Sequence, residues 1–194
     1  MKILKYTILG LLVILFLIIL MGIANPSIGY GHEIMVDKPI KEAWAVSQDD
    51  KKYDQWLEGF KSFELIEGEK WKEGSKYKVV VDPGDGQPEF EMIETLVSIN
   101  DFESVEMHFD SEFMNFEQVM HFTEERGKTS VKTESKVLAK GLMMRSMFAI
   151  MEIFGGSFTA QEKKNMEALK KLIEENTTDY YPRVRPSIDN TQEQ

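Results

Sequence analysis

Four polar side chains fall among apolar residues in segments that otherwise alternate between apolar and charged positions. They are Glu94, Gln118, Thr133 and Ser135, and each shares the apolar side of its segment when every second residue is counted. A carboxyl, an amide and two hydroxyls on an apolar face could orient a ligand inside an apolar pocket. They could equally hydrogen-bond to one another or lie at the rim of a pocket. Burial raises the pKa of a carboxyl group, which makes Glu94 the strongest candidate for an acid or base.

The other residues of chemically active types form no catalytic or metal-binding arrangement. His108 and His121 fall on the charged side of neighbouring segments, where a surface metal site is conceivable but a solvated face is the simpler interpretation. The chain has three His and no Cys, which excludes a thiol nucleophile, thiolate metal ligands and disulfides. No Ser-His-Asp order supports a hydrolytic nucleophile. We therefore expect no catalytic residue that can be named, no metal and no cofactor.

The composition indicates one folded domain with additional segments. The chain has 194 residues, of which 42% are hydrophobic and 11% aromatic, which is enough for a packed core and unlike a disordered chain. Its net charge of −10 argues against a nucleic-acid partner, because phosphate groups require basic surfaces.

The N-terminal segment is long and apolar enough to cross a membrane. Residues 7–24 contain no charged residue, and as a helix they would span about 27 Å, close to the hydrocarbon thickness of a bilayer. Lys2 and Lys5 precede the segment and the next basic residue is Lys38, so the positive-inside rule places residues 1–6 in the cytoplasm and the rest outside. A cleaved signal peptide is the alternative, although no A-x-A cleavage site follows. Both interpretations predict an exported domain.

Hydrophobic periodicity divides the rest of the chain into a linker (residues 25–31), an α+β domain (residues 32–175) and a polar tail (residues 176–194), which we expect to be disordered. A first strand at residues 32–37 precedes two short helices. Turn signals such as Pro83-Gly84 then separate six further strands, which the short turns make antiparallel. These strands are residues 63–66, 75–81, 90–99, 104–109, 116–124 and 129–138.

A helical period replaces the strand pattern from residue 142 to residue 175. Gly155-Gly156 interrupts its apolar stripe and predicts a kink or a break there. The strands have one mostly apolar side and one mostly charged side, which indicates a single sheet with one solvated face and one face covered by this helix. Methionines recur along the helix, and they suit either a plastic hydrophobic pocket or ordinary core packing.

The start of the domain resembles a known superfamily. The run V-D-K-P-I-K-E-A-W (residues 36–44), followed by Y-D-Q-W (residues 53–56), is similar to the opening of SRPBCC domains, and the resemblance covers residues 32–175. The superfamily includes START lipid-transfer domains, polyketide cyclase/dehydrase-like proteins and plant pathogenesis-related proteins. The resemblance implies an α+β helix-grip fold, in which a curved antiparallel sheet wraps around a long C-terminal helix and leaves an apolar cavity between them.

The residues and the resemblance together predict a membrane-anchored domain that binds a hydrophobic small molecule or lipid in this cavity. One alternative is a cyclase/dehydrase-like enzyme that uses a pocket carboxylate such as Glu94. Another is a protein-interaction module with a filled core and an exposed apolar patch, near residues 113–116 or near Gly155-Gly156. The predicted cavity residues are Phe90, Met92, Glu94, Met107, Gln118, Met120, Thr133, Ser135, Met147, Met151, Phe154 and Phe158.

Overall fold

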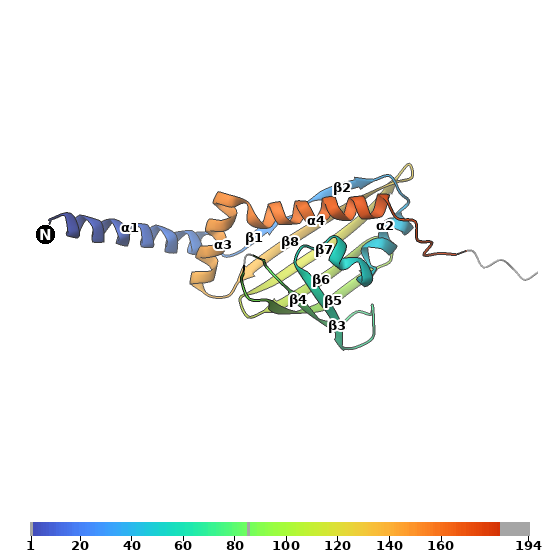
Figure 1. The fold of residues 1–194 in the computed structure, drawn as a ribbon, viewed down its shortest axis with the longest axis horizontal. Coiled ribbons are helices and arrows are strands. Elements are labelled where there is room, and N and C mark those ends of the chain that lie inside the picture. Colours follow the sequence, from blue (N-terminus) through green and yellow to red (C-terminus); the bar gives the residue numbers. More distant parts are fainter. Residues whose placement is uncertain (1, 85, 183–194) are drawn as a thin grey trace, which may run out of the picture.

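The computed structural model describes residues 2–84 and 86–182, and Figure 1 shows one long helix that projects from the end of an α+β domain. This helix, α1 (Lys2–Ala24), contains the segment expected to cross a membrane. It is the one helix of the described residues that is long and apolar enough to span a bilayer. The other helices are α2 (Ile40–Ser47), the 3₁₀ helix η1 (Asp50–Gln55), α3 (Leu142–Gly155) and α4 (Ser157–Glu174).

Eight strands of the described chain form one antiparallel sheet. Their order is β1-β8-β7-β6-β5-β4-β3. Strand β2 also pairs with β8, at residues 129–132, whereas β1 pairs with residues 135–137. All the strands predicted from the sequence are present, with ends that differ by a few residues. The strands are β1 (Ile28–Tyr30), β2 (Glu33–Val36), β3 (Phe60–Glu67), β4 (Lys76–Val81), β5 (Phe90–Asn100), β6 (Ser104–Ser111), β7 (Met114–Glu125) and β8 (Lys128–Ala139).

The sequence does not predict β1, which lies within residues 25–31, the expected linker. Three residues that include a glycine give no hydrophobic alternation, so pairing with β8 alone creates this strand. Gly31 follows it and passes so close to β8 that a Cβ atom there would lie 2.2 Å from the carbonyl oxygen of Thr133. The chain is therefore bound to the sheet almost immediately after α1 ends.

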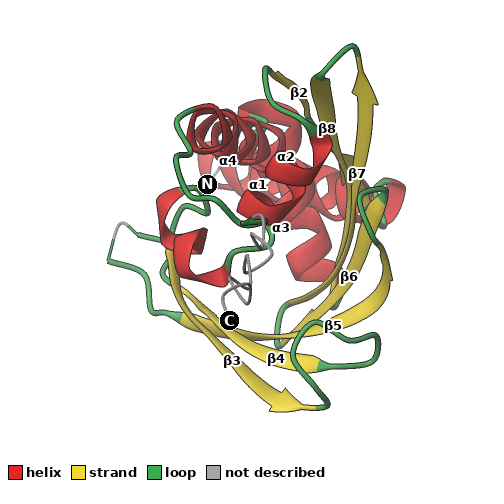
Figure 2. Ribbon diagram, turned by 90° about the vertical axis from the view of Figure 1, so that its right-hand side faces the viewer, coloured by secondary structure: helices red, strands yellow, loops and turns green. Residues whose placement is uncertain are grey.

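The sheet curves around the helices, as Figure 2 shows. Fully buried side chains of the sheet, among them Val36, Leu96 and Val131, belong to the same core cluster as Leu169 and Ile173 of α4. Burying these apolar surfaces is the main stabilising contribution to such a core. The inward and outward sides of the strands agree with the alternation in the sequence. The fold is the α+β helix-grip arrangement that the resemblance implied.

The C-terminal helix is broken at the glycine pair, as predicted. Gly156 adopts a left-handed conformation (φ 57°), which ends α3. The Glu152 carboxylate accepts hydrogen bonds from the backbone N–H of Phe158, at 2.8 Å, and from the Thr159 hydroxyl, so it satisfies the first turn of α4. Because of this break, the second part of the C-terminal helix, α4, lies in the curve of the sheet. The first part, α3, crosses the end of the domain where α1 joins it (Figure 1).

The first part of the predicted tail packs on the domain. Lys52 donates a hydrogen bond to the Asn176 side chain at 3.0 Å, and the Tyr180 hydroxyl donates one to Asp49 at 2.7 Å. These contacts connect the end of α4 to η1. Residues 183–194, which were also expected to be disordered, lie outside the described residues.

We expect Leu169→Ala to lower the free energy of unfolding by about 2–5 kcal/mol, because it removes a fully buried side chain from the core cluster. Urea unfolding of the full chain in detergent micelles measures this change through tryptophan fluorescence. Leu65→Ala, at an exposed position of β3, is the control and should change the same quantity by less than about 0.5 kcal/mol. Equal losses in the two variants would contradict the position of α4 in the core.

Candidate ligand-binding cavity

A cavity of about 220 Å³ lies between the concave side of the sheet, η1 and α4. Its wall is mostly apolar, and its polar side chains are Ser47, Gln48, Glu58, Glu94, Gln118, Gln161, Glu162 and Asn165. This is the arrangement typical of small-molecule sites, in which apolar area provides affinity and a few polar groups fix the orientation. The apolar and aromatic lining residues are Tyr30, Tyr53, Trp56, Leu57, Phe60, Phe63, Val79, Val81, Met92, Met107, Phe109, Phe116, Met120 and Phe158.

Half of the predicted cavity residues line this cavity. They are Met92, Glu94, Met107, Gln118, Met120 and Phe158. Thr133 and Ser135 are buried on β8 but do not form part of the lining. Phe90, the first residue of β5, also lies outside the lining. The alternation of every second residue therefore identified the inward side of the central strands, but it did not show how far the cavity extends along them.

The three candidates on α3 do not line the cavity. Met147, Met151 and Phe154 are 43%, 42% and 79% exposed. Their assignment assumed that they continue the stripe of Phe158, which holds only for an unbroken helix. The left-handed residue Gly156 changes the direction of the chain between α3 and α4, so these three residues lie outside the lining of this cavity.

Glu94 places a carboxyl group in the cavity wall. It lies on β5 opposite Tyr77 of β4 and Phe109 of β6, and it is 5% exposed. Burial raises the pKa of this carboxyl from 4.5 to about 8, and no cation among the described residues opposes the shift. The carboxyl is therefore mainly protonated at pH 7, and its O–H can donate a hydrogen bond to a molecule in the cavity.

Tyr53 and Trp56 add two polar groups on the η1 side. Their rings pack edge to face with centroids 6.0 Å apart. The indole N–H of Trp56 is buried and has no hydrogen-bond partner among the described residues. Burial, and secondarily the charge of Glu94, raises the pKa of the Tyr53 hydroxyl, which stays protonated. A buried donor without an acceptor is unfavourable, and this N–H has almost no surface open to the cavity, so its cost falls on the folded domain itself.

A hydrogen-bonded cluster closes the cavity between the sheet and α4. The Gln118 amide donates to the Ser135 hydroxyl at 3.0 Å and to Glu162 at 3.4 Å, and the Thr133 hydroxyl donates to the same Glu162 oxygen. Burial raises the pKa of Glu162, although the Thr133 hydrogen bond opposes this shift. Three of the four polar residues singled out in the sequence thus hydrogen-bond within one cluster, while Glu94 stands apart.

Sequence reasoning missed most residues of the lining, among them Glu162, Tyr53 and Trp56. Glu162 lies four residues after Phe158 and four before Met166, so a charged residue on the buried stripe of a helix was an available signal. Tyr53 and Trp56 entered the sequence analysis only as part of the Y-D-Q-W run that carries the resemblance. Only the fold brings η1 over the concave side of the sheet.

Solved structures with the same arrangement are numerous, whereas no protein-family profile and no curated protein sequence matches the chain. A crystal structure of Ara h 8.0201 superposes with a TM-score of 0.57 at 13% identity, over 77% of this chain and 99% of that one. A conserved protein from Geobacillus kaustophilus gives 0.59 at 20% identity, over 75% and 93%. Truncated norcoclaurine synthase from Thalictrum flavum gives 0.55 at 14% identity, over 77% and 95%.

These identities are low, and what the superpositions establish is the fold. They agree with the curved sheet and the helix that it wraps around, as described above. The chain therefore has the SRPBCC-type helix-grip fold, preceded by an apolar N-terminal helix.

Proposed function

We propose that the protein binds a small hydrophobic molecule in the cavity between the sheet and α4. The observation that supports this most is the cavity itself, with about 220 Å³ enclosed by apolar side chains in a fold known for binding hydrophobic ligands. Small-molecule pockets usually measure about 300–1,000 Å³, so the volume suits a compact molecule or a single short chain better than a whole phospholipid. A ligand that buries about 200 Å² of apolar surface gains about 5 kcal/mol before the costs of association.

The polar groups of the wall narrow the chemistry of this ligand. The Glu94 carboxyl lines the cavity and, because its pKa is raised to about 8, can donate a hydrogen bond from its O–H. A neutral ligand with a carbonyl or hydroxyl oxygen can accept this bond. A ligand made only of hydrocarbon would offer the carboxyl no acceptor, which disfavours it.

The same proposal places the domain at a membrane. The helix α1 has 23 residues and the length and composition of a membrane span. Lys2 and Lys5 at its start favour an N-terminus in the cytoplasm and a domain outside it. Cleavage of α1 as a signal peptide would instead release the domain after export.

Native mass spectrometry of the full chain, extracted from membranes into detergent micelles, tests the binding proposal. We expect a reproducible adduct with the mass of a small apolar molecule, which organic extraction then releases for identification. A mass equal to that of the chain alone, in preparations from which no apolar molecule can be extracted, would contradict the proposal. The intact mass also shows directly whether α1 is retained or cleaved.

An acid–base enzyme is the second candidate, and Glu94 is the observation that favours it. A carboxyl group with a pKa of about 8 lies close to the range in which a general acid or base works best at neutral pH. Norcoclaurine synthase, one of the structural neighbours, shows that the fold supports an enzyme. Incubating the extracted molecule with the wild-type chain and with Glu94→Gln would separate the two candidates. Conversion by the wild type that the variant loses would favour the enzyme.

A further inference from the structure

The helix α3 exposes a large apolar face. Met143 is 84% exposed and Phe154 is 79% exposed, and Leu142, Met147, Met151 and Ile153 are also exposed. Soluble surfaces rarely expose several large apolar side chains on one short helix unless the helix contacts a partner or a membrane. The opposite face of α3 is buried, because Phe148 packs against Val137 and Ala139 of β8 and Ala149 is also buried.

The charges of α3 do not oppose contact with lipid. Arg145 and Glu152 are its two charged residues. Glu152 is occupied with the first turn of α4, as described above. Arg145 is basic, and a long arginine side chain beside an apolar face can reach lipid phosphates while its helix lies among acyl chains. No free acidic group therefore remains on the exposed side of this helix.

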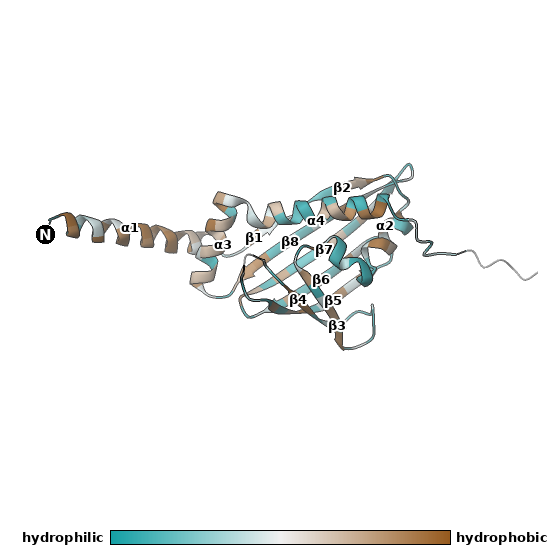
Figure 3. Ribbon diagram, in the orientation of Figure 1, coloured by the Kyte–Doolittle hydropathy of each residue, from teal (hydrophilic) through white to brown (hydrophobic). Residues whose placement is uncertain are grey.

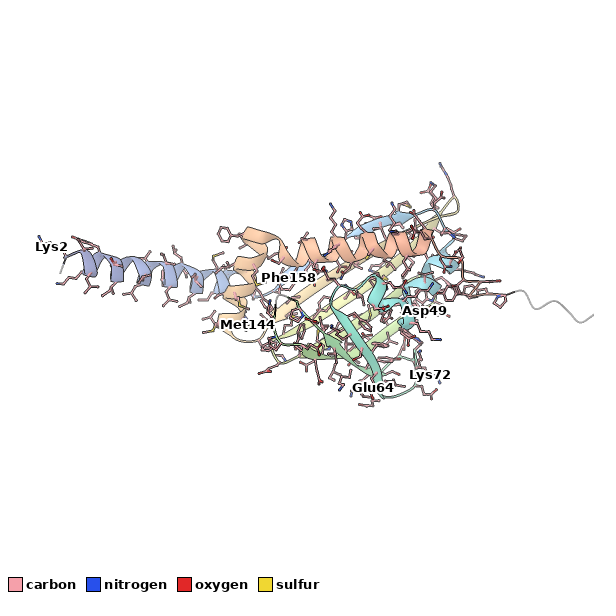
Figure 4. The ribbon with its side chains drawn as sticks, in the orientation of Figure 1. Lys2, Asp49, Glu64, Lys72, Met144 and Phe158 are labelled. Carbon is pink, nitrogen blue, oxygen red and sulfur yellow. The ribbon has the colours of Figure 1, made fainter. Side chains whose placement is uncertain are left out.

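The position of α3 is set by a close contact with α1. Gly22 is the buried residue of α1, and a Cβ atom on it would lie 2.3 Å from the Ser146 hydroxyl oxygen and 2.7 Å from the Ser146 backbone nitrogen. The two helices therefore touch backbone to side chain at this point. Figure 3 shows that the apolar colouring of α1 continues onto α3, and Figure 4 shows Met144 of α3 near Phe158, at the end of the domain that α1 enters.

The length of α1 determines the depth at which α3 lies. The expected span, residues 7–24, covers about 27 Å of helix, close to the hydrocarbon thickness of a bilayer. Gly22 is two residues from the end of this span, so it lies near the boundary between acyl chains and headgroups on the side opposite Lys2 and Lys5. The residues of α3 that pack on Gly22 lie at this same boundary.

We infer that α3 is an interfacial membrane helix, which lies in the surface of the bilayer that α1 crosses and buries its apolar face among the acyl chains. This inference rests on the proposed membrane span. It means that the domain is held directly against the bilayer, without a flexible tether. The rest of the chain is acidic, so attraction to anionic lipid does not hold the domain at the bilayer. Insertion of the apolar side chains of α3 among the acyl chains holds it there. Phe148 on the inner side of α3 contacts Phe158 of the cavity wall, with ring centroids 5.2 Å apart, so the cavity lies next to this membrane contact.

Spin labels on single cysteines test the inference in the full chain, which has no natural cysteine to interfere. The labelled positions are Met143→Cys and Phe154→Cys on α3, Leu12→Cys in the middle of α1, and Ile66→Cys as an equally apolar, exposed control on β3. Each variant is placed in phosphatidylcholine vesicles. The accessibility of each label to oxygen, which partitions into lipid, is compared with its accessibility to a water-soluble nickel chelate.

We expect the ratio of oxygen to nickel accessibility at Met143 and Phe154 to be several-fold higher than at Ile66 and to approach the ratio at Leu12. A lipid-like ratio at Leu12 together with a water-like ratio on α3 would overturn the inference and leave the membrane span intact. Low accessibility to both reagents on α3 would also overturn it, because a protein surface would then cover the helix. A water-like ratio at Leu12 would instead contradict the proposed span.

Discussion

Replacement of Glu94 by Gln is expected to remove a large part of the decrease in stability that the protein shows as the pH rises from about 4.5 to about 8. Burial raises the pKa of the Glu94 carboxyl from 4.5 to about 8 in the folded state. Between these values the folded state binds a proton that the unfolded state has released. The stabilisation is therefore fully present below pH 4.5 and is lost as the pH rises through the folded pKa.

The expected size follows from the same shift. One pKa unit corresponds to about 1.4 kcal/mol, so the free energy of unfolding should differ between Glu94→Gln and the wild type by several kcal/mol more at pH 9 than at pH 5. Urea unfolding of the full chain in micelles across this pH range measures the difference. Glu162 titrates in the same direction, but it is present in both proteins and cancels.

The matched control for this experiment is Glu91→Gln. Glu91 lies on the same strand with its side chain in solvent, and it forms only an exposed ion pair with Lys78 at 3.4 Å. We expect its stability difference from the wild type to stay within about 0.5 kcal/mol at every pH. A Glu94→Gln curve parallel to the wild-type curve would show that this carboxyl titrates normally and is not buried in the cavity wall.

Introducing a tryptophan at Met107 is expected to weaken ligand binding strongly while the domain remains folded. Met107 lines the cavity from the central strand β6, so a larger ring there enters the volume that a ligand must occupy. A ligand that loses about 80 Å² of apolar contact loses about 2 kcal/mol of binding free energy. This corresponds to an affinity about 30-fold lower. The new ring fills existing space. The free energy of unfolding of the domain should therefore fall by about 2 kcal/mol at most, which is within the range typical of overpacking.

Titration of the delipidated protein with the molecule extracted from the wild type, followed by native mass spectrometry, measures this affinity. The matched control is Val97→Trp, which adds the same ring at an exposed position on the adjacent strand β5. We expect the control to bind the ligand like the wild type. Undiminished binding by Met107→Trp would place the ligand outside the cavity, and equal loss in both variants would indicate a general defect of folding.

Parts of this architecture were predictable because they depend on short-range signals. Alternation of apolar and charged residues identified the strands and placed Glu94 on the same side as Leu96, which is fully buried. The Gly155-Gly156 pair marked the break between α3 and α4, because glycine readily adopts the left-handed conformation seen at Gly156. The uncharged N-terminal segment identified α1 by length and composition alone.

Other parts of the site were not predictable from these signals. The direction of the chain after Gly156 decides whether Met151 and Phe154 face the cavity or the exterior, and periodicity does not encode that direction. The strand β1 exists only because Ile28 and its neighbours pair with a strand more than a hundred residues later. Glu162 becomes part of the site only because Gln118 and Thr133 reach it across the gap between sheet and helix.

The sequence by itself determined the elements of this protein and the inward side of each strand, since both follow from the pattern of a few neighbouring residues. It also determined that one segment has the length and composition of a membrane span. The tertiary structure alone decided that Glu94 and Trp56 line one cavity and that Gly22 of α1 meets Ser146 of α3. The physical reason is that such contacts join residues distant in the chain, whose approach depends on how the whole sheet curves and where the helices cross it.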